Sequence, residues 1–212
     1  MKISWKQIAT GMLAVMMLVL VGCGGTKDDT HAAAPGKLKV VATTTMLADL
    51  SRQIGGDAVE VTGLMGPGVD PHLYQASAGD VKVMTDADVV VYNGLHLEGK
   101  MGEIFSKLKQ DKKATICVAN NLDPSTLLQY EDDDGVQATD PHIWFDVKNW
   151  MLAAEEVCKG LAAKDPAHKD LYKANYEKYL AELKKADEYV AKRAAEIPQE
   201  RRVLVTAHDA FQ

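Results

Sequence analysis

The sequence predicts an α/β protein in which a doubly wound lobe is joined by one long helix to the beginning of a second lobe. Short β-rich runs alternate with helical segments of about ten residues, the pattern of a parallel sheet with helices on its faces. The run Val89–Tyr92 is apolar at every position, as strands buried on both faces of a parallel sheet are. Residues 166–197 carry apolar or aromatic side chains in steps of three and four, which predicts a helix long enough to connect two lobes.

The N-terminal segment has the features of an export signal. Lysines precede an apolar stretch at residues 8–22, which is shorter than the roughly 20 residues that a membrane-spanning helix needs. Residues 20–23, Leu-Val-Gly-Cys, resemble a lipobox; the alternative is an ordinary signal with a chance cysteine. We therefore expect residues 1–22 to be a lipoprotein signal peptide and residues 23–36 to be a flexible tether. Acyl chains on Cys23 would hold the exported protein at the outer face of the cell membrane.

The first α/β lobe is expected over residues 37–165. Ser77 and Asp80 have the spacing of a capping box, which predicts the start of a helix. Residues 120–139 show no periodicity and include an acidic run at 131–134, which is more typical of a solvated loop than of a metal-collecting segment. The predicted strands are 38–43, 59–64, 89–92 and 115–118, and the predicted helices are 46–54, 77–84, 101–108 and 148–164.

The long linking helix is assigned to residues 166–198, and its periodic segment 166–197 would be about 48 Å long at 1.5 Å per residue. It precedes a β-rich run at 203–206, which predicts a new strand. We expect residues 199–212 to be the start of a C-terminal α/β lobe that is truncated in this chain. The alternative is that the strand joins the sheet of the first lobe.

Composition narrows the function classes. The chain has 212 residues, a formal net charge of −6 and a pI near 5.5, which argues against a nucleic-acid-binding protein, since those present a basic face. Cys117 and Cys158 have no CxxC partner, so we interpret both as small buried hydrophobic side chains rather than metal thiolates or a disulfide.

The histidines carry the chemistry. Two of them end the same tripeptide, in Asp70-Pro71-His72 and in Asp140-Pro141-His142. Proline restricts its own backbone and that of the preceding residue, so each imidazole is presented from a stiff loop. His208 follows the predicted strand 203–206, at the edge where open α/β sheets bind ligands. Three convergent imidazoles would suit a divalent transition metal.

The remaining histidines fit simpler roles. We expect His31 to be solvated in the tether, His168 to be exposed on the polar face of the long helix, and His96 to be structural. Asp70, Asp140 and Asp209 are close enough in sequence to orient the imidazoles from outside the ligand set. Three neutral imidazoles leave the charge of the ion uncompensated, so a carboxylate ligand is expected as well.

Four segments resemble the solute-binding lipoproteins of manganese and zinc ABC transporters, the cluster A-I family. They are Gly63–Tyr74, Asn93–Glu98, Asp140–Trp144 and Thr206–Phe211. The resemblance implies two Rossmann-like lobes joined by one long helix, with a metal ion in the cleft between the lobes. It also implies that His72, His142 and His208 are metal ligands, and that the fourth ligand is an aspartate beyond residue 212. The protein would act as a monomer and deliver the ion to a membrane permease.

The cargo is expected to be Mn²⁺ or Zn²⁺. A nitrogen-rich site favours zinc in the order of metal affinities, whereas the resemblance favours manganese, and we favour manganese narrowly. Two other classes stay open: a lipid-anchored adhesin or scaffold with incidental metal binding, and a secreted zinc hydrolase. The hydrolase is disfavoured because no HExxH motif occurs and no carboxylate is placed as a general base.

Overall fold

The computed structural model describes residues 36–131, 137–208 and 210–211. The expected signal peptide and nearly all of the tether, with Cys23 and His31, lie outside the described residues, and so does Asp209. Within the described ranges, no helix combines the length and the apolar character needed to cross a membrane.

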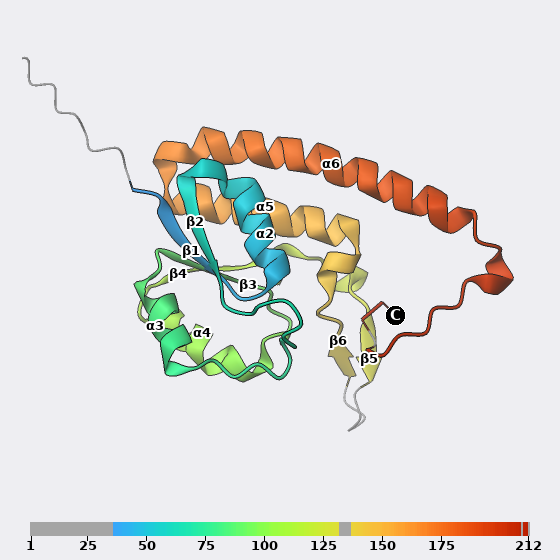
Figure 1. Cartoon of the computed structure of the whole chain (residues 1–212), viewed down its shortest axis with the longest axis horizontal. Helices are drawn as coiled ribbons and strands as arrows, with labels where there is room; N and C mark the ends of the chain where they lie inside the picture. Colours follow the sequence, from blue (N-terminus) through green and yellow to red (C-terminus); the bar gives the residue numbers. More distant parts are fainter. Residues whose placement is uncertain (1–35, 132–136, 209, 212) are drawn as a thin grey trace, which may run out of the picture. The chain divides into compact units, whose positions relative to one another are not determined.

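A four-stranded parallel sheet forms the centre of the described chain (Figure 1). Its strand order is β2-β1-β3-β4. The chain adds β2 on one side of β1 and β3 on the other side, so the order in which strands are added reverses between β1 and β3. In open α/β sheets, ligands bind at the carboxyl edge beside such a reversal. The structure confirms all four predicted strands of the lobe. They are β1 (Leu38–Ala42), β2 (Val59–Gly63), β3 (Val89–Tyr92) and β4 (Ala114–Cys117).

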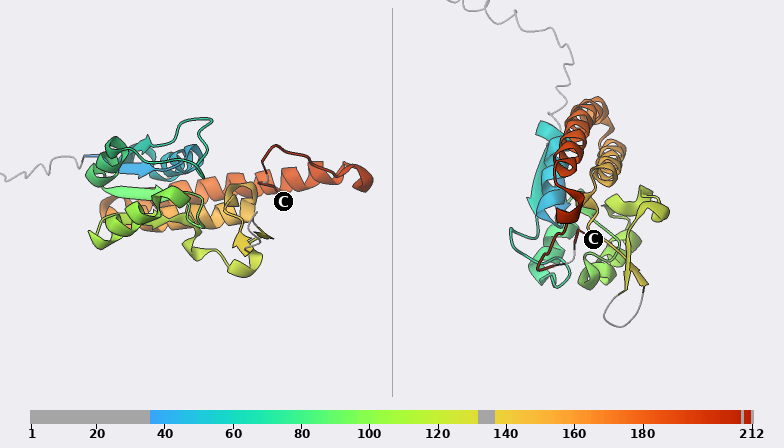
Figure 2. Two further views of the ribbon diagram at one scale, coloured as in Figure 1. Left: turned by 90° about the horizontal axis from the view of Figure 1, so that it is seen from below. Right: turned by 90° about the vertical axis from the view of Figure 1, so that its right-hand side faces the viewer.

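Helices cover both faces of this sheet (Figure 2). The side chains of β3 alternate between two cores: Val89 and Val91 face one, and Val90 and Tyr92 face the other. This double burial explains why every position of the strand is apolar. The first core is closed by α2 (Thr45–Gly55), α5 (Val147–Lys164) and α6 (Lys169–Ala195), and the second by α3 (Ala78–Asp86) and α4 (Gly102–Gln110).

Side-chain caps fix where several helices begin. Ser77 and Asp80 form the predicted capping box of α3: the Ser77 hydroxyl accepts from the Asp80 amide, and the Asp80 carboxylate accepts from the Ser77 amide. Asp146 caps α5 by accepting from the amides of Lys148 and Asn149. Asp146 lies only four residues after His142. Its cap therefore fixes the point at which the loop that carries His142 enters α5.

The predicted loop at 120–139 contains more structure than its sequence suggested. Two short strands, β5 (Gln129–Glu131) and β6 (Gln137–Thr139), pair antiparallel. Their side chains are mostly exposed, so no apolar alternation announces them. Glu131, the only described residue of the acidic run, is exposed, as a solvated surface would be.

The long helix is shorter than predicted. Pro166–His168 forms a 3-10 turn, and α6 then spans 27 residues, or about 40 Å. Its first half packs on α5 and α2: the Trp150 indole donates to the Tyr179 hydroxyl, and the Asn175 amide donates to the Ile54 carbonyl. The second half extends past the end of α5 (Figure 1) and leaves Val190 56% exposed.

Two further expectations need correction. Residues 203–206 do not form a strand: they pair with no other strand of the described chain, and Val203 and Val205 are 78% and 88% exposed. A strand needs a neighbour for its backbone hydrogen bonds, so β propensity alone does not form one. His168 is half-buried rather than exposed, because its Nδ1 lies 2.7 Å from an Asp165 carboxylate oxygen.

The two described cysteines have free thiols, Cys117 and Cys158, and both are half-buried against the first core. The hydrophobic role expected for them is therefore correct, although their burial is less complete than predicted. Burial raises the pKa of both thiols. They are poor nucleophiles at neutral pH for that reason.

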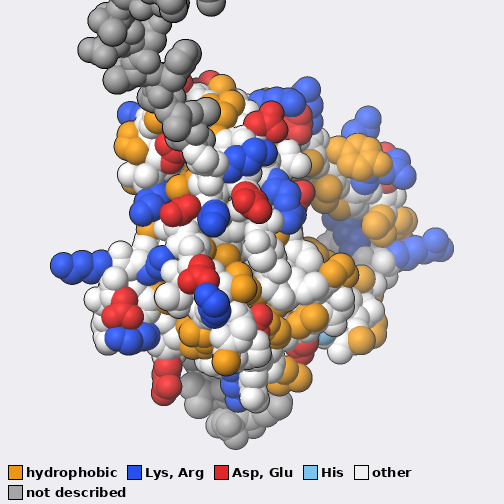
Figure 3. Space-filling view, turned by 60° about the vertical axis from the view of Figure 1, so that its left-hand side comes forward, with side chains coloured by type: hydrophobic (Ala, Val, Ile, Leu, Met, Phe, Trp, Pro, Cys, Tyr) orange, Lys and Arg blue, Asp and Glu red, His pale blue; other side chains and the backbone are white. Residues whose placement is uncertain are grey.

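Charges of both signs are interspersed on the face of the described chain that Figure 3 shows. Lysine, arginine, aspartate and glutamate side chains alternate there rather than gathering by sign. This differs from the basic stripe that nucleic-acid-binding proteins present.

Candidate metal centre

Three imidazoles converge beside the carboxyl edge of the sheet. The Nε2 atom of His142 lies 3.1 Å from Nε2 of His72 and 3.0 Å from Nε2 of His208. Within the described chain, these three residues are the group of histidine, cysteine or acidic side chains whose ligand atoms lie close enough to hold one metal ion. They come from three separate segments, so only the tertiary fold brings them together.

His72 is carried by the segment that follows β2. That segment first continues the sheet pairing, since the Leu64 and Met65 amides donate to the carbonyls of Ala42 and Thr43. The backbone then turns at Asp70, whose carboxylate accepts the His72 amide at 2.9 Å. Such a turn, followed by the fixed backbone of proline, holds the half-buried imidazole at low entropic cost.

His142 is the most constrained member of the cluster. Asp140 accepts its backbone amide at 2.8 Å and its ring Nδ1 at 2.6 Å. Both side chains are buried, at 7% exposed for His142 and 9% for Asp140. A carboxylate on Nδ1 fixes the proton there and leaves the lone pair of Nε2 pointing at the other two imidazoles.

His208 reaches the cluster from the irregular segment that returns from the end of α6 (Figure 1). Its backbone carbonyl accepts from the Thr206 hydroxyl at 2.8 Å, which forms a tight local turn. Phe211 packs against Phe145, with ring centroids 4.1 Å apart, and Ala210 is buried. These contacts anchor the segment beside the site, although His208 itself is exposed.

The surroundings of His72 favour its neutral imidazole. The pKa of His72 is lowered by its burial, and then by the neighbouring His142, against the opposing influence of Asp70. A neutral imidazole is the form that binds a metal, since a protonated nitrogen has no lone pair to give.

The donor set fits a divalent transition metal. A tetrahedral ion with metal–nitrogen distances of about 2.1 Å holds its ligand nitrogens about 3.4 Å apart, close to the 3.0 and 3.1 Å measured here. Three imidazoles leave a further coordination position open. The Asp70 and Asp140 carboxylates accept from the backbone amides of His72 and His142, so they hold histidines of the cluster and lie outside the group of candidate ligands.

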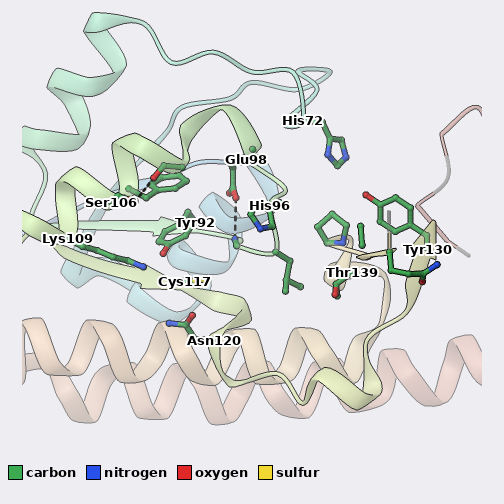
Figure 4. A pocket seen from close by; sticks show the side chains of 18 residues that line it. His72, Tyr92, His96, Glu98, Ser106, Lys109, Cys117, Asn120, Tyr130 and Thr139 are labelled. Atoms are coloured by element: carbon green, nitrogen blue, oxygen red, sulfur yellow. Dashed lines mark hydrogen bonds between the residues drawn. The ribbon is translucent and has the colours of Figure 1, made fainter. Parts of the chain in front are cut away.

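A cavity of about 930 Å³ adjoins the cluster (Figure 4). Figure 4 shows His72 above the space between the loop with His96 and Glu98 and the β5–β6 segment with Tyr130 and Thr139. His96, which we expected to be structural, is exposed and has a φ of 60° in this loop. Among the described residues, His96 lies outside the group of side chains that are close enough to share one metal ion.

Two groups of residues near the site were missed by the reasoning from sequence. Asn93 and Glu98 are almost fully buried although they are polar, at 1% and 3% exposed. They belong to a segment that carried the family resemblance, yet the sequence gives no sign of burial for either. The Phe145–Phe211 contact joins residues 66 positions apart and had no local signal either.

Comparison with known proteins agrees with this architecture. The family model described as "Zinc-uptake complex component A periplasmic" matches residues 40–212. The chain is 44% identical over 207 residues to the zinc-binding protein TroA of Treponema pallidum, a match that covers 97% of this chain and 65% of that protein. It is 41% identical over 204 residues to the manganese-binding lipoprotein MntA of Bacillus subtilis, covering 95% and 65%. The solved structure of the periplasmic zinc-binding protein TroA of Treponema pallidum matches with a TM-score of 0.78 at 46% identity, covering 83% of this chain and 62% of that one.

The parallel sheet and the long helix define an α/β protein whose three convergent imidazoles lie at the carboxyl edge of the sheet. More particularly, the chain belongs to the zinc-uptake complex component A family. The resemblance to manganese and zinc solute-binding lipoproteins is thereby confirmed. The chain spans 65% of the length of the first curated relatives it matches.

Proposed function

We propose that this chain captures a divalent transition metal for an ABC importer and delivers it to a membrane permease. The observation that carries the proposal is that Nε2 of His142 lies 3.1 Å from Nε2 of His72 and 3.0 Å from Nε2 of His208. These Nε2 atoms come from three separate segments and lie close enough together to be shared by a single ion. The ion here is cargo, so the site needs to bind and to release it.

Each ligand has a defined role in this proposal. His142, held by Asp140, is the fixed ligand around which the site is organised. His72 is held through its backbone by Asp70 and supplies the second nitrogen. His208 comes from the irregular segment after α6 and supplies the third, so its approach would complete the capture of the ion.

The cargo is Mn²⁺ or Zn²⁺ in this proposal, with manganese narrowly favoured from the sequence. The nitrogen donors favour zinc, because manganese stands lowest in the affinity order of divalent ions. The relatives include both, since one is named zinc-binding and another manganese-binding. A titration with both ions at matched free concentration decides between them.

The setting of the site follows from the N-terminal sequence and the relatives. We propose that the chain is exported, that Cys23 carries the lipid anchor, and that it acts as a monomer at the outer face of the membrane. One relative is named a manganese-binding lipoprotein and others are named substrate-binding lipoproteins of metal ABC transporters, which supports this placement. The proposal includes no catalytic step.

Thermal unfolding tests the metal site directly. The full chain, kept in mild detergent, is heated with and without Mn²⁺ or Zn²⁺, beside a triple variant with His72→Ala, His142→Ala and His208→Ala. An ion at 100 times its dissociation constant stabilises the folded state by about 2.7 kcal/mol, which raises the midpoint by several degrees. The matched control is a double variant, His96→Ala with His168→Ala, which removes histidines outside the cluster.

The proposal expects the metal to raise the midpoint of the parent and of the control but not of the triple variant. Equal midpoint shifts in all three proteins would show that the ion binds elsewhere. Absence of a shift in the parent would show that these three histidines do not capture the ion in this chain.

A further inference from the structure

Asn93 and Glu98 are buried polar residues that lie at the reversal point of the sheet, outside the three-histidine cluster. Asn93 directly follows β3, and the Glu98 carboxylate reaches the neighbouring end of β1. Buried polar groups are costly unless they are hydrogen-bonded, so their partners show what they stabilise.

The Glu98 carboxylate ties the ends of the two central strands together. One of its oxygens accepts from the Thr43 hydroxyl at 2.6 Å and from the Asn93 amide at 2.8 Å. The other accepts from the Gly94 amide at 3.3 Å (Figure 4). Thr43 follows β1 and Asn93 follows β3, so one carboxylate fixes both sides of the reversal point. Burial raises the pKa of Glu98, and these donors act against that effect.

A left-handed turn brings Glu98 into this position. Three successive residues have positive φ: Gly94 at 86°, Leu95 at 51° and His96 at 60°. Left-handed backbone costs free energy for residues other than glycine, and it persists where surrounding contacts enforce it. Here the Leu97 amide closes the turn on the Gly94 carbonyl, and Glu98 holds the two amides that open it.

Asn93 extends this network to the loop that carries a ligand. Its side-chain Nδ2 donates to the Pro141 carbonyl at 2.9 Å and to the Gly94 carbonyl at 3.1 Å. These two acceptors fix the orientation of the amide, because the opposite orientation would place Oδ1 against two carbonyl oxygens. Oδ1 has no partner among the described residues, so its burial is tolerated only for the sake of the two donated bonds.

The Pro141 carbonyl is the acceptor that shapes the backbone of His142. The Ile143 amide donates to it at 2.8 Å, and His142 has φ −81° and ψ 49°, which together form an inverse γ-turn centred on the ligand. The same carbonyl therefore closes the turn around His142 and accepts from Asn93. A shift of this carbonyl would move the backbone from which the imidazole projects.

We propose that Asn93, held in place by Glu98, is the positioning residue that sets His142 at the right distance from the other two histidines. The inference rests on the proposed function, since it concerns the geometry of the same metal site. Asp140 orients the ring of His142, whereas Asn93 fixes its backbone against the sheet. A shift in this backbone would separate the Nε2 atoms and weaken the hold on the ion.

The test compares two asparagines that donate the same kind of hydrogen bond. Asn93→Ala removes the bond to the Pro141 carbonyl near the site. Asn175→Ala removes the hydrogen bond that the Asn175 side-chain amide donates to the Ile54 carbonyl at 3.0 Å. This bond joins α6 to α2 and lies away from the three histidines. The probe is Zn²⁺, titrated into the full chain in mild detergent against a competing chelator. Visible absorption of bound Co²⁺ reports the coordination geometry, which a purely structural role would leave unchanged.

We expect Asn93→Ala to weaken Zn²⁺ binding by roughly tenfold, a loss typical of residues that orient metal ligands. The spectrum of bound Co²⁺ should change as well. Asn175→Ala should keep the parent affinity and spectrum. If Asn93→Ala does not fold, Asn93→Ser replaces it, because its hydroxyl is too short to reach the carbonyl.

An Asn93 variant that binds Zn²⁺ with the parent affinity and spectrum would overturn the positioning role while leaving the metal site standing. A triple histidine variant that still binds Zn²⁺ as the parent does would overturn the metal site itself, and the positioning role with it. The two failures are therefore distinguishable in one set of titrations.

Discussion

Asp140 holds His142 at two points, accepting its backbone amide at 2.8 Å and its ring Nδ1 at 2.6 Å. In the otherwise identical tripeptide that ends at His72, Asp70 is shown to accept only the backbone amide, at 2.9 Å. The two Asp-Pro-His sequences thus have different local roles. Asp140 fixes the ring of a buried histidine, whereas Asp70 fixes only the turn that precedes a half-buried histidine.

This difference predicts unequal effects of removing the two carboxylates. Asp140→Ala should weaken Zn²⁺ binding by about 10- to 100-fold, because the ring of His142 loses its fixed tautomer and orientation. Asp70→Ala is the matched control and should weaken binding by less than about threefold, since the ring of His72 keeps its other contacts. Chelator competition measures both affinities, and equal losses in the two variants would contradict the assigned roles.

The contact between Phe145 and Phe211 predicts a variant that affects binding more than folding. Both rings are 47% exposed, and they pack at 4.1 Å next to the segment that carries His208. Phe211→Ala should lower metal affinity by about two- to tenfold, the equivalent of an aromatic contact worth about 0.5 to 1.5 kcal/mol. The midpoint of the metal-free chain should change little.

Phe105→Ala provides the contrast for that prediction. Its ring stacks on Tyr92 at the same 4.1 Å, but it is only 6% exposed and lies in the second core. Its removal should cost about 3 to 5 kcal/mol of folding stability. Calorimetry and metal titration together separate the two outcomes, and a large stability loss in Phe211→Ala would refute the distinction.

A third prediction concerns the junction between α5 and α6. The Asp165 carboxylate accepts from the Tyr172 hydroxyl and lies against His168 Nδ1, each at 2.7 Å. Burial alone would raise the pKa of Asp165, but the hydrogen bonds from Tyr172 and His168 outweigh it and the pKa is lowered. Asp165→Asn should therefore destabilise the chain by about 1 to 2 kcal/mol at neutral pH.

The same carboxyl predicts a pH dependence. A carboxyl with a lowered pKa binds fewer protons in the folded state, so its contribution is complete above its ordinary value near 4 and disappears as the pH falls through the lower folded value. Urea unfolding between about pH 6 and pH 2 should show a shallower acid loss for Asp165→Asn than for the parent. Asp86→Asn, which alters an exposed ion pair with Lys82, should leave stability at neutral pH nearly unchanged. Parallel acid profiles for the parent and Asp165→Asn would count against this account.

The sequence predicted best those parts of the fold whose pattern is local. Val89–Tyr92 is apolar throughout because both of its faces are buried, and Ser77 with Asp80 forms the capping box that its spacing indicated. The pair β5 and β6 escaped prediction because exposed residues such as Gln129 and Gln137 leave no apolar periodicity. Their pairing depends on which segments the fold brings together.

The structure brings the three predicted histidines together, but only some of the reasons for expecting this were correct. His72 and His142 were found from their shared tripeptide, and both lie in the loops expected of them. His208 was placed after a strand that does not form, yet the irregular chain still brings it to within 3.0 Å of His142. The burial of Asn93 and Glu98 is a tertiary property, so composition and spacing could not reveal it.

The most direct test of the metal site is X-ray absorption at the zinc edge, measured on the full chain loaded with one equivalent of Zn²⁺. Three imidazole ligands give a first shell of nitrogen at about 2.0 to 2.1 Å and the multiple scattering characteristic of the rings. The account predicts three imidazoles in the parent and fewer in His142→Ala. A shell with one imidazole or none, or with a sulfur at about 2.3 Å, would contradict the assignment of His72, His142 and His208 as the site.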